Sequence, residues 1–175
     1  MSRIDERAMR IVEIGKRHPE VRIECVEGEA GRIISARLRP GTDLITGIKH
    51  LTKKYSILAG AVTVSFGSLA TAEVTWKEGS KVDPKKKGER IRLIGPLSFL
   101  ASQGKVGITE EGEPIVHLHG VLVDMEGRLW GGHFHEGNNP VFSTFELVIH
   151  EILGVRHTTI YGDESEVALL KAKKL

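Results

Sequence analysis

The sequence has a single cysteine, no long apolar run and no strong excess of charge of either sign. Because Cys25 stands alone among 175 residues, neither an internal disulfide bond nor a cysteine-based zinc cage can form. No apolar run approaches the roughly 18 residues that a membrane-spanning helix needs. The charged start M-S-R-I-D-E-R is also unlike a signal peptide. We therefore expect a cytoplasmic protein that has no membrane partner.

The charge balance and the absence of several motifs limit the classes of function that the sequence supports. A formal net charge of +2, from 25 basic and 23 acidic residues, neither requires nor excludes a nucleic-acid partner. The sequence has no phosphate-binding glycine loop, no G-x-S-x-G elbow and no H-E-x-x-H pair. It therefore carries none of the signatures of nucleotide-phosphate binding, serine hydrolysis or zinc-dependent proteolysis.

Two helices are predicted in the first third of the chain. Residues 2–17 carry an amphipathic apolar stripe, and Pro19 ends this helix. A second helix begins at the capping residue Thr42 or Asp43 and reaches about residue 55. We expect each helix to bury its apolar stripe against other parts of the protein.

Alternating and β-branched segments, separated by glycine, proline and polar turns, predict about seven or eight strands. Besides the hairpin described below, they lie at residues 21–26, 31–39, 57–76 (two segments with a bend at Gly67-Ser68), 91–100, 104–109, 141–152 and 154–161. A short helix remains an alternative for residues 141–152. Residues 163–173 are compatible with a C-terminal helix or an irregular tail.

These elements do not alternate as helix and strand, and no internal repeat is present, so the pattern indicates an α+β fold. We predict an antiparallel or mixed sheet of about seven strands with one main packed helix and an N-terminal helix. The N-terminal helical extension takes residues 1–28, the main domain residues 29–162 and the C-terminal tail residues 163–175. Residues 77–90 form a basic insertion between two strands of the main domain.

Residues 114–137 hold four of the eight histidines, as two His-x-His pairs on either side of a turn signal. His117 and His119 share one strand face, as do His133 and His135, because successive side chains of a strand alternate. The two pairs form the arms of a predicted β-hairpin. Whether they meet depends on the length of its loop.

A three-residue loop of Met125, Glu126 and Gly127 places the glycine where a left-handed residue is favoured. It pairs Asp124 with Arg128, and therefore His119 with His133 and His117 with His135. A two-residue loop of Glu126 and Gly127 would instead put the two pairs on opposite faces. A bulge at Gly131-Gly132 would also shift the pairing.

Imidazole is a ligand for Zn, Ni, Cu and Fe, and three histidines leave a zinc ion one open position for water or substrate. His117, His119 and His133 are the preferred candidate ligands. His135 is a fourth ligand, a proton shuttle or an exposed neighbour. The alternative is a polar sheet face on which the histidines only pack and hydrogen-bond.

Two further candidates lie outside the hairpin. Glu146, in an otherwise apolar strand, is either an extra ligand or general base near the metal or a surface residue. The insertion carries Lys85, Lys86 and Lys87, which belong either to a solvated loop or to a phosphate-contacting one.

Three segments, in this order, resemble motifs of the PPC (plants and prokaryotes conserved) domain family in its prokaryotic type. The resemblance extends over about residues 31–161. These segments read G-R-I-I-S-A-R-L-R-P-G-T-D-L, A-V-T-V-S-F-G-S-L-A-T-A-E-V and V-H-L-H-G-V-L-V-D-M-E-G-R-L-W-G-G-H. The resemblance implies an antiparallel α+β fold that assembles as a trimer. It also implies that the signature histidines, which fall on His117, His119 and His133, bind a metal. The H-x-H…G-G-H arrangement is similar to that of acetolactate decarboxylases, where three such histidines hold a catalytic zinc.

The resemblance implies a metal-binding, trimeric protein with a DNA-binding or regulatory role. The expected cofactor is Zn²⁺ or another transition metal such as Ni²⁺, Fe²⁺ or Mn²⁺. Since this chain lacks the AT-hook of plant relatives, DNA contacts would depend on the lysine-rich insertion and the basic face of the second helix. The alternative function is a zinc-dependent enzyme, a lyase or a hydrolase, acting on a small carboxylate or carbonyl compound.

Overall fold

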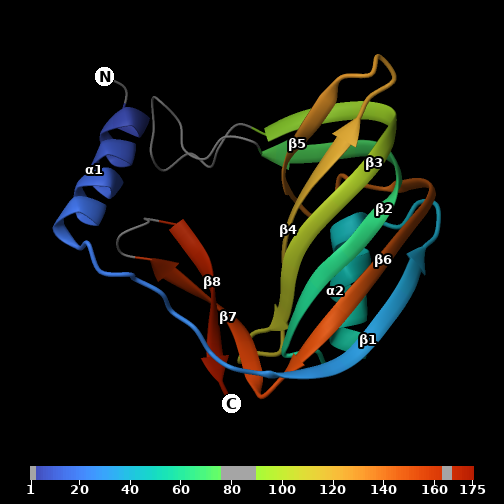
Figure 1. Ribbon diagram of the computed structural model, residues 1–175. Coiled ribbons are helices and arrows are strands. Elements are labelled where there is room, and N and C mark those ends of the chain that lie inside the picture. The colour runs from blue at the N-terminus through green and yellow to red at the C-terminus, as the bar shows by residue number, and fades with distance from the viewer. Residues whose placement is uncertain (1–2, 76–89, 163–166) are drawn as a thin grey trace.

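The structure, a computed structural model, describes residues 3–75, 90–162 and 167–175. Within these residues the chain forms two helices and eight strands (Figure 1). The helices are α1 (Arg3–Arg17) and α2 (Leu44–Lys54). The strands are β1 (Glu29–Leu38), β2 (Ala59–Thr75), β3 (Arg90–Ile108), β4 (Pro114–Val123), β5 (Leu129–Phe134), β6 (Val141–Leu153), β7 (Val155–Gly162) and β8 (Val167–Lys174).

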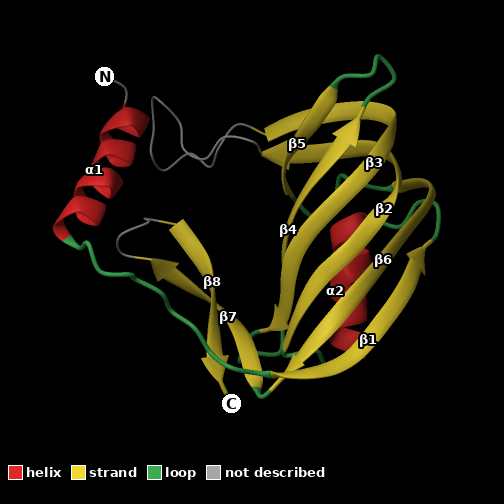
Figure 2. Cartoon of the chain, viewed as in Figure 1, coloured by secondary structure: helices red, strands yellow, loops and turns green. Residues whose placement is uncertain are grey.

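Six strands form one antiparallel sheet in the order β1-β6-β2-β3-β4-β5 (Figure 2). The long strand β2 pairs with β6 along its first part and with β5 near its end. Strands β2, β3, β4 and β5 therefore close on themselves at one end of the sheet. Strands β7 and β8 make a separate two-stranded sheet. The predicted antiparallel α+β fold is confirmed, with eight strands.

Helix α2 covers one face of the six-stranded sheet, behind it in the view of Figure 1. Asp43 caps the helix, since its side chain accepts a hydrogen bond from the backbone N–H of Thr46. Leu44 and Ile48 are completely buried against the sheet. The sheet contributes alternate residues to this core, among them Ile34, Leu38, Phe99, Leu118, Phe134, Phe145 and Ile149. The opposite face of the sheet carries the hairpin histidines.

The bend predicted at Gly67-Ser68 is present, but the two segments predicted on either side of it form one continuous strand, β2. Gly67 has a φ of 154°, and a Cβ atom there would collide with the backbone of Thr144 on β6. The pairing of β2 with β6 shifts register between Gly67 and Leu69. Only glycine allows this close approach, after which β2 leaves β6 and continues toward β5.

Three predictions of local structure were wrong. Residues 21–26 form no strand, and Val21 and Ile23 are 83% and 72% exposed without a partner strand in the described chain. Residues 91–108 belong to one strand rather than two, because a register shift opposite Leu69 and Thr71 accommodates Gly95-Pro96. The C-terminal segment, expected as a helix or tail, forms β8, which pairs along the whole of β7.

Helix α1 projects from the sheet, at the left of Figure 1, and its apolar residues Met9, Ile11 and Val12 are exposed. Neither helix in the described part of the chain has the length and apolar character of a membrane span. The boundaries proposed at residues 28 and 162 stay a prediction.

Candidate metal centre

The turn between β4 and β5 has the predicted three-residue loop. The backbone N–H of Asp124 donates to the carbonyl of Arg128 at 3.1 Å, and that of Gly127 donates to the carbonyl of Asp124 at 3.0 Å. Gly127 has a φ of 77°, the left-handed conformation that this loop requires. The side chain of Asp124 also accepts hydrogen bonds from the backbone of Glu126 and Arg128. The local sequence therefore determines the register of the hairpin.

This register pairs His119 directly with His133, as predicted. The glycines that follow in β5 do not shift it: Gly132 opposes Gly120 and Gly131 opposes Val121. A Cβ atom on Gly131 would lie 2.8 Å from the carbonyl oxygen of Gly120. The small residues thus allow β4 and β5 to approach closely beside the histidines.

The predicted pairing of His117 with His135 is wrong. Strand β5 ends at Phe134, and the backbone N–H of His135 donates to the carbonyl of Glu73 on β2. The His135 ring remains 4.7 Å from the His133 ring, measured between centroids. Its Nε2 atom lies 2.6 Å from the Thr75 hydroxyl. His135 therefore stands beside the other histidines and is held by β2.

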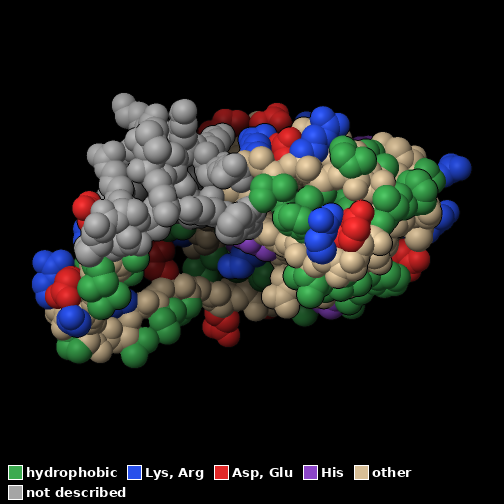
Figure 3. All heavy atoms as spheres, turned by 90° about the horizontal axis from the view of Figure 1, so that it is seen from above, with side chains coloured by type: hydrophobic (Ala, Val, Ile, Leu, Met, Phe, Trp, Pro, Cys, Tyr) green, Lys and Arg blue, Asp and Glu red, His purple; other side chains and the backbone are tan. Residues whose placement is uncertain are grey.

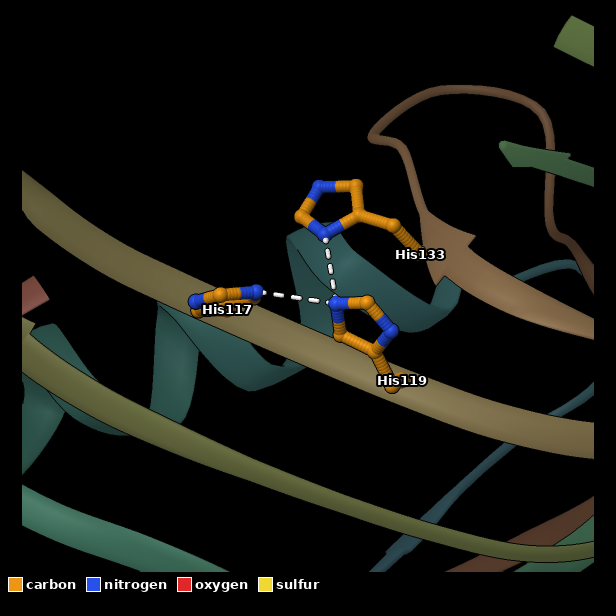
Figure 4. Close-up of side chains that lie close together, drawn as sticks. All are labelled: His117, His119 and His133. Atoms are coloured by element: carbon orange, nitrogen blue, oxygen red, sulfur yellow. Dashed lines mark hydrogen bonds between the residues drawn. The ribbon is translucent and has the colours of Figure 1, made fainter. Parts of the chain in front are cut away.

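His117, His119 and His133 converge on one point (Figure 4). His117 Nε2 lies 2.9 Å from His119 Nε2, which lies 3.4 Å from His133 Nδ1. The three nitrogens all lie within 4.8 Å of one another. A tetrahedral zinc ion with Zn–N bonds of about 2.0–2.1 Å holds its nitrogen ligands roughly 3.3–3.4 Å apart. The spacing of the three imidazoles is thus close to that of a transition-metal site.

The electrostatic surroundings keep His133 neutral. Its partial burial, followed by the positive potentials of His135, His117, His119 and Arg90, lowers its pKa to about 4. Neutral imidazole is the form that binds a metal ion, because the ligand nitrogen must keep its lone pair. At pH 7 His133 is consequently ready to act as a ligand.

A buried asparagine, which no sequence motif singles out, supports the loop after β5. Asn139 is 0% exposed, and its side-chain amide donates to the carbonyl of His135. Its side-chain oxygen accepts from the backbone of Glu73 at 2.8 Å, and its backbone N–H donates to Asp43 at 2.8 Å. Asn139 therefore connects the histidine cluster to the start of α2.

Two polar residues of β3 are also neighbours of the cluster. In the register of β3 and β4, Lys105 opposes His117 and Gln103 opposes His119. Directly opposed side chains lie on the same face of a sheet. The sequence could not identify these neighbours, because 12 residues or more separate each pair in the chain and only the strand order brings them together.

The structure does not bring Glu146 to the histidines of its own chain. Glu146 lies on β6, opposite Arg37 and Phe66, and two strands, β2 and β3, separate β6 from β4. It is exposed and lines a hollow of about 440 Å³ together with Arg37, Val64 and Phe66. Within one chain, the expected role of Glu146 beside the metal is therefore wrong.

The candidate nucleic-acid residues Lys85, Lys86 and Lys87 lie outside the described residues. The basic residues of α2 are described: Lys49 forms an ion pair with Glu136 at 2.5 Å, and Lys54 lies over the Tyr55 ring. With Lys53 they line a depression of about 850 Å³ on the side of the protein that carries α2. They therefore belong to the α2 side of the sheet, although Lys49 contacts the residue that follows His135.

Several solved structures share this fold. A PPC protein from Pyrococcus horikoshii is 27% identical with a TM-score of 0.72, over 87% of this chain and 100% of that one. A metal-containing protein from Archaeoglobus fulgidus is 22% identical with a TM-score of 0.72, over 85% and 99% of the two chains. A third structure is that of a Ralstonia eutropha protein named as a candidate DNA-binding protein. It is 18% identical with a TM-score of 0.67, over 78% of this chain and 89% of that one.

Among curated proteins, the chain is similar to two proteins named Bifunctional protein GlmU, from Synechococcus strains JA-3-3Ab and JA-2-3B'a(2-13). Both are 29% identical, over 125 and 118 residues, which is 71% and 67% of this chain. The matched regions span only 18% and 16% of those proteins. The similarity therefore concerns one part of a much longer relative.

The family-level match covers most of the chain. The model of the Plants and Prokaryotes Conserved domain, abbreviated PCC or PPC, matches residues 25–153. This range contains α2, the whole six-stranded sheet and the hairpin with its four histidines. The chain belongs to the Plants and Prokaryotes Conserved domain family.

Proposed function

We propose that this protein binds a transition metal through His117, His119 and His133 and acts as a trimeric DNA-binding or regulatory module. The observation that carries the proposal is the convergence of three imidazole nitrogens within 4.8 Å. The structural similarity to a metal-containing protein of Archaeoglobus fulgidus supports it. Zn²⁺ fits three neutral imidazoles best, and Ni²⁺ and Fe²⁺ also accept such ligands.

The site fits the metal in its chemistry as well as in its spacing. The cluster lies on the outside of the sheet of one chain, where the His117 and His119 side chains are exposed. His135 Nε2 lies within hydrogen-bond distance of the Thr75 hydroxyl, and we propose His135 as a neighbour of the three ligands. When bound, the metal would supply a Lewis acid with one position open for a further ligand.

Metal analysis tests the first part of the proposal. We expect about one transition-metal ion per chain, since three histidines make one site. A His117→Ala/His119→Ala variant should lose this metal. His50→Ala, at an exposed histidine of α2, is the matched control and should keep it. A wild-type preparation that was never exposed to chelator and contains no metal would contradict the proposal.

The DNA-binding part rests on the family and on the basic face of α2. A titration of duplex DNA at two salt concentrations tests it, because each lost phosphate contact reduces the slope of log K against log[salt] by about 0.9. Charge reversal at Lys53 and Lys54 should weaken binding and reduce the slope. A triple alanine variant at Lys85, Lys86 and Lys87 measures the contribution of the insertion. Binding that is absent, or that does not depend on salt, would contradict this part.

An enzymatic function is the second candidate. Three protein ligands would leave an open coordination position, and the cluster is accessible on the sheet face. A zinc-dependent lyase or hydrolase acting on a small carboxylate or carbonyl compound would use such a site, in line with the resemblance to acetolactate decarboxylases. Since Glu146 lies two strands away, the general base of such a reaction would have to be another group.

A further inference from the structure

We propose that Lys105 and Gln103 complete a binding site for a small oxyanion, whose other anchor is the open position of the metal at His117, His119 and His133. This inference rests on the proposed metal binding and adds to it the chemical class of the ligand. Its basis is the register of β3 against β4, which sets the two polar side chains beside two of the three histidines.

The register across the sheet defines the site as two short rows on one face. In the first row Gln103, His119, His133 and Thr75 follow one another on β3, β4, β5 and β2. In the second row Lys105 opposes His117. Opposed residues have Cβ atoms about 4.5–5.5 Å apart, so the side chains of both β3 residues are long enough to extend to the imidazoles next to them. No residue that opposes the three histidines in these pairings is acidic.

Both β3 side chains are available to a ligand. Lys105 and Gln103 are exposed, and neither makes a hydrogen bond or an ion pair with another residue in the described ranges. Arg90, the other nearby cation, differs because its guanidinium binds Glu73 at 2.6 Å. Figure 3 shows histidine side chains next to a lysine or arginine side chain in the hollowed part of the face that it presents.

The charges of the site favour an anionic ligand once a metal is bound. Three neutral imidazoles leave the charge of a divalent ion uncompensated, and the ammonium group of Lys105 adds a further positive charge beside it. The metal ion and the ammonium group are both positive and repel each other, whereas an oxyanion between them attracts both. One oxygen would occupy the metal and another would accept a hydrogen bond from Lys105, while the amide of Gln103 donates to the same group.

Carboxylates and phosphate share this chemistry, and a titration distinguishes them. The protein is loaded with Co²⁺, whose visible spectrum reports a change of ligand, and is titrated separately with acetate, oxalate and inorganic phosphate. We expect at least one of these to bind. Lys105→Met should weaken that binding by roughly 10- to 100-fold, the loss of a hydrogen bond between charged groups. Lys105→Arg should restore most of the affinity.

Two controls make the result specific. Lys53→Met removes an exposed lysine from α2, on the other side of the protein, and should leave oxyanion affinity unchanged. Gln103→Leu removes the amide and should weaken binding independently of Lys105. Equal affinity in the wild type and in Lys105→Met, or an equal loss in Lys53→Met, would overturn the inference.

The metal content of each preparation separates this inference from the proposed function. A wild type that takes up no metal contradicts both. A Lys105→Met variant that keeps its metal and binds every oxyanion as the wild type does contradicts only the role of Lys105, and leaves the metal site standing.

Discussion

Asp124 shows how one residue sets the geometry of the histidine hairpin. Its carboxylate accepts hydrogen bonds from Arg128 Nε at 2.7 Å and Trp130 Nε1 at 2.8 Å, in addition to those from the turn backbone. Burial alone would raise the pKa of Asp124, but the hydrogen bonds from Trp130 and Arg128 lower it from 3.8 to about 2. The ionised carboxylate therefore stabilises the turn that aligns His133 with His119.

We predict that Asp124→Asn lowers the melting temperature at neutral pH. The pKa of Asp124 is lower in the folded state than in the unfolded state. Its contribution to the stability of the fold is therefore complete above pH 3.8 and is lost as the pH falls to about 2. The difference between wild type and variant should therefore shrink over this range. Thermal unfolding followed by circular dichroism at several pH values measures it. Glu126→Gln, at an exposed neighbour in the same turn, is the control, and a constant difference at all pH values would contradict the prediction.

At the scale of elements, one buried carboxylate joins β1, β6 and the end of α2. Glu151 is 7% exposed on β6 and accepts two hydrogen bonds from the Arg32 guanidinium, both at 2.7 Å. Arg32 also donates to the carbonyl of Tyr55, the residue that caps α2. The side-chain hydrogen bond from Arg32 lowers the pKa of Glu151, so the pair is ionised at neutral pH.

Glu151→Gln should destabilise the fold by about 1–3 kcal/mol, because it replaces hydrogen bonds between charged groups by weaker ones. Urea denaturation at pH 7 measures the change in the free energy of unfolding. Glu146→Gln is a matched control on the same strand, because Glu146 is exposed on the opposite face. An equal loss in both variants would show that the Arg32 contacts are not the cause.

The elements also show where local signals suffice. Helix α2, with a cap at Thr42 or Asp43, and a β4–β5 turn of two or three residues were predicted, because each depends on contacts between residues close in the chain. Strand β8 was not, because its Val-Ala-Leu-Leu-Lys run has no strong strand signal and pairs with β7 only after the chain has turned back. The secondary structure of such a segment depends on the strand with which it pairs rather than on its local sequence.

At the scale of the whole molecule, the histidine face of the sheet is notably apolar. Ile33, Val64, Phe66 and Val121 are each at least 44% exposed on it. Their cross-strand partners place them on the face that carries Lys105 and His117 rather than on the α2 side. An apolar surface of this kind marks an interaction site, and the proposed trimer would cover it.

We expect light scattering to give a mass of about three times the 19.3 kDa of one chain. A Phe66→Asp substitution should dissociate the assembly, because it places a charge in the apolar face. Val21→Asp, at an exposed apolar residue outside the sheet, should leave the mass unchanged. A wild-type protein with the mass of a single chain would contradict the proposed trimer.

The sequence by itself determined the α+β fold class, α2 and the hairpin, and it offered the three-residue loop whose register brings His119 to His133. These follow from turn chemistry, capping and side-chain periodicity, which act over a few residues. Only the tertiary structure decided that His135 turns toward Thr75, that Glu146 lies two strands from the cluster, and that Lys105 and Gln103 stand beside it. Strand order and the closure of β5 onto β2 place these residues, and both depend on hydrogen bonds between segments far apart in the chain.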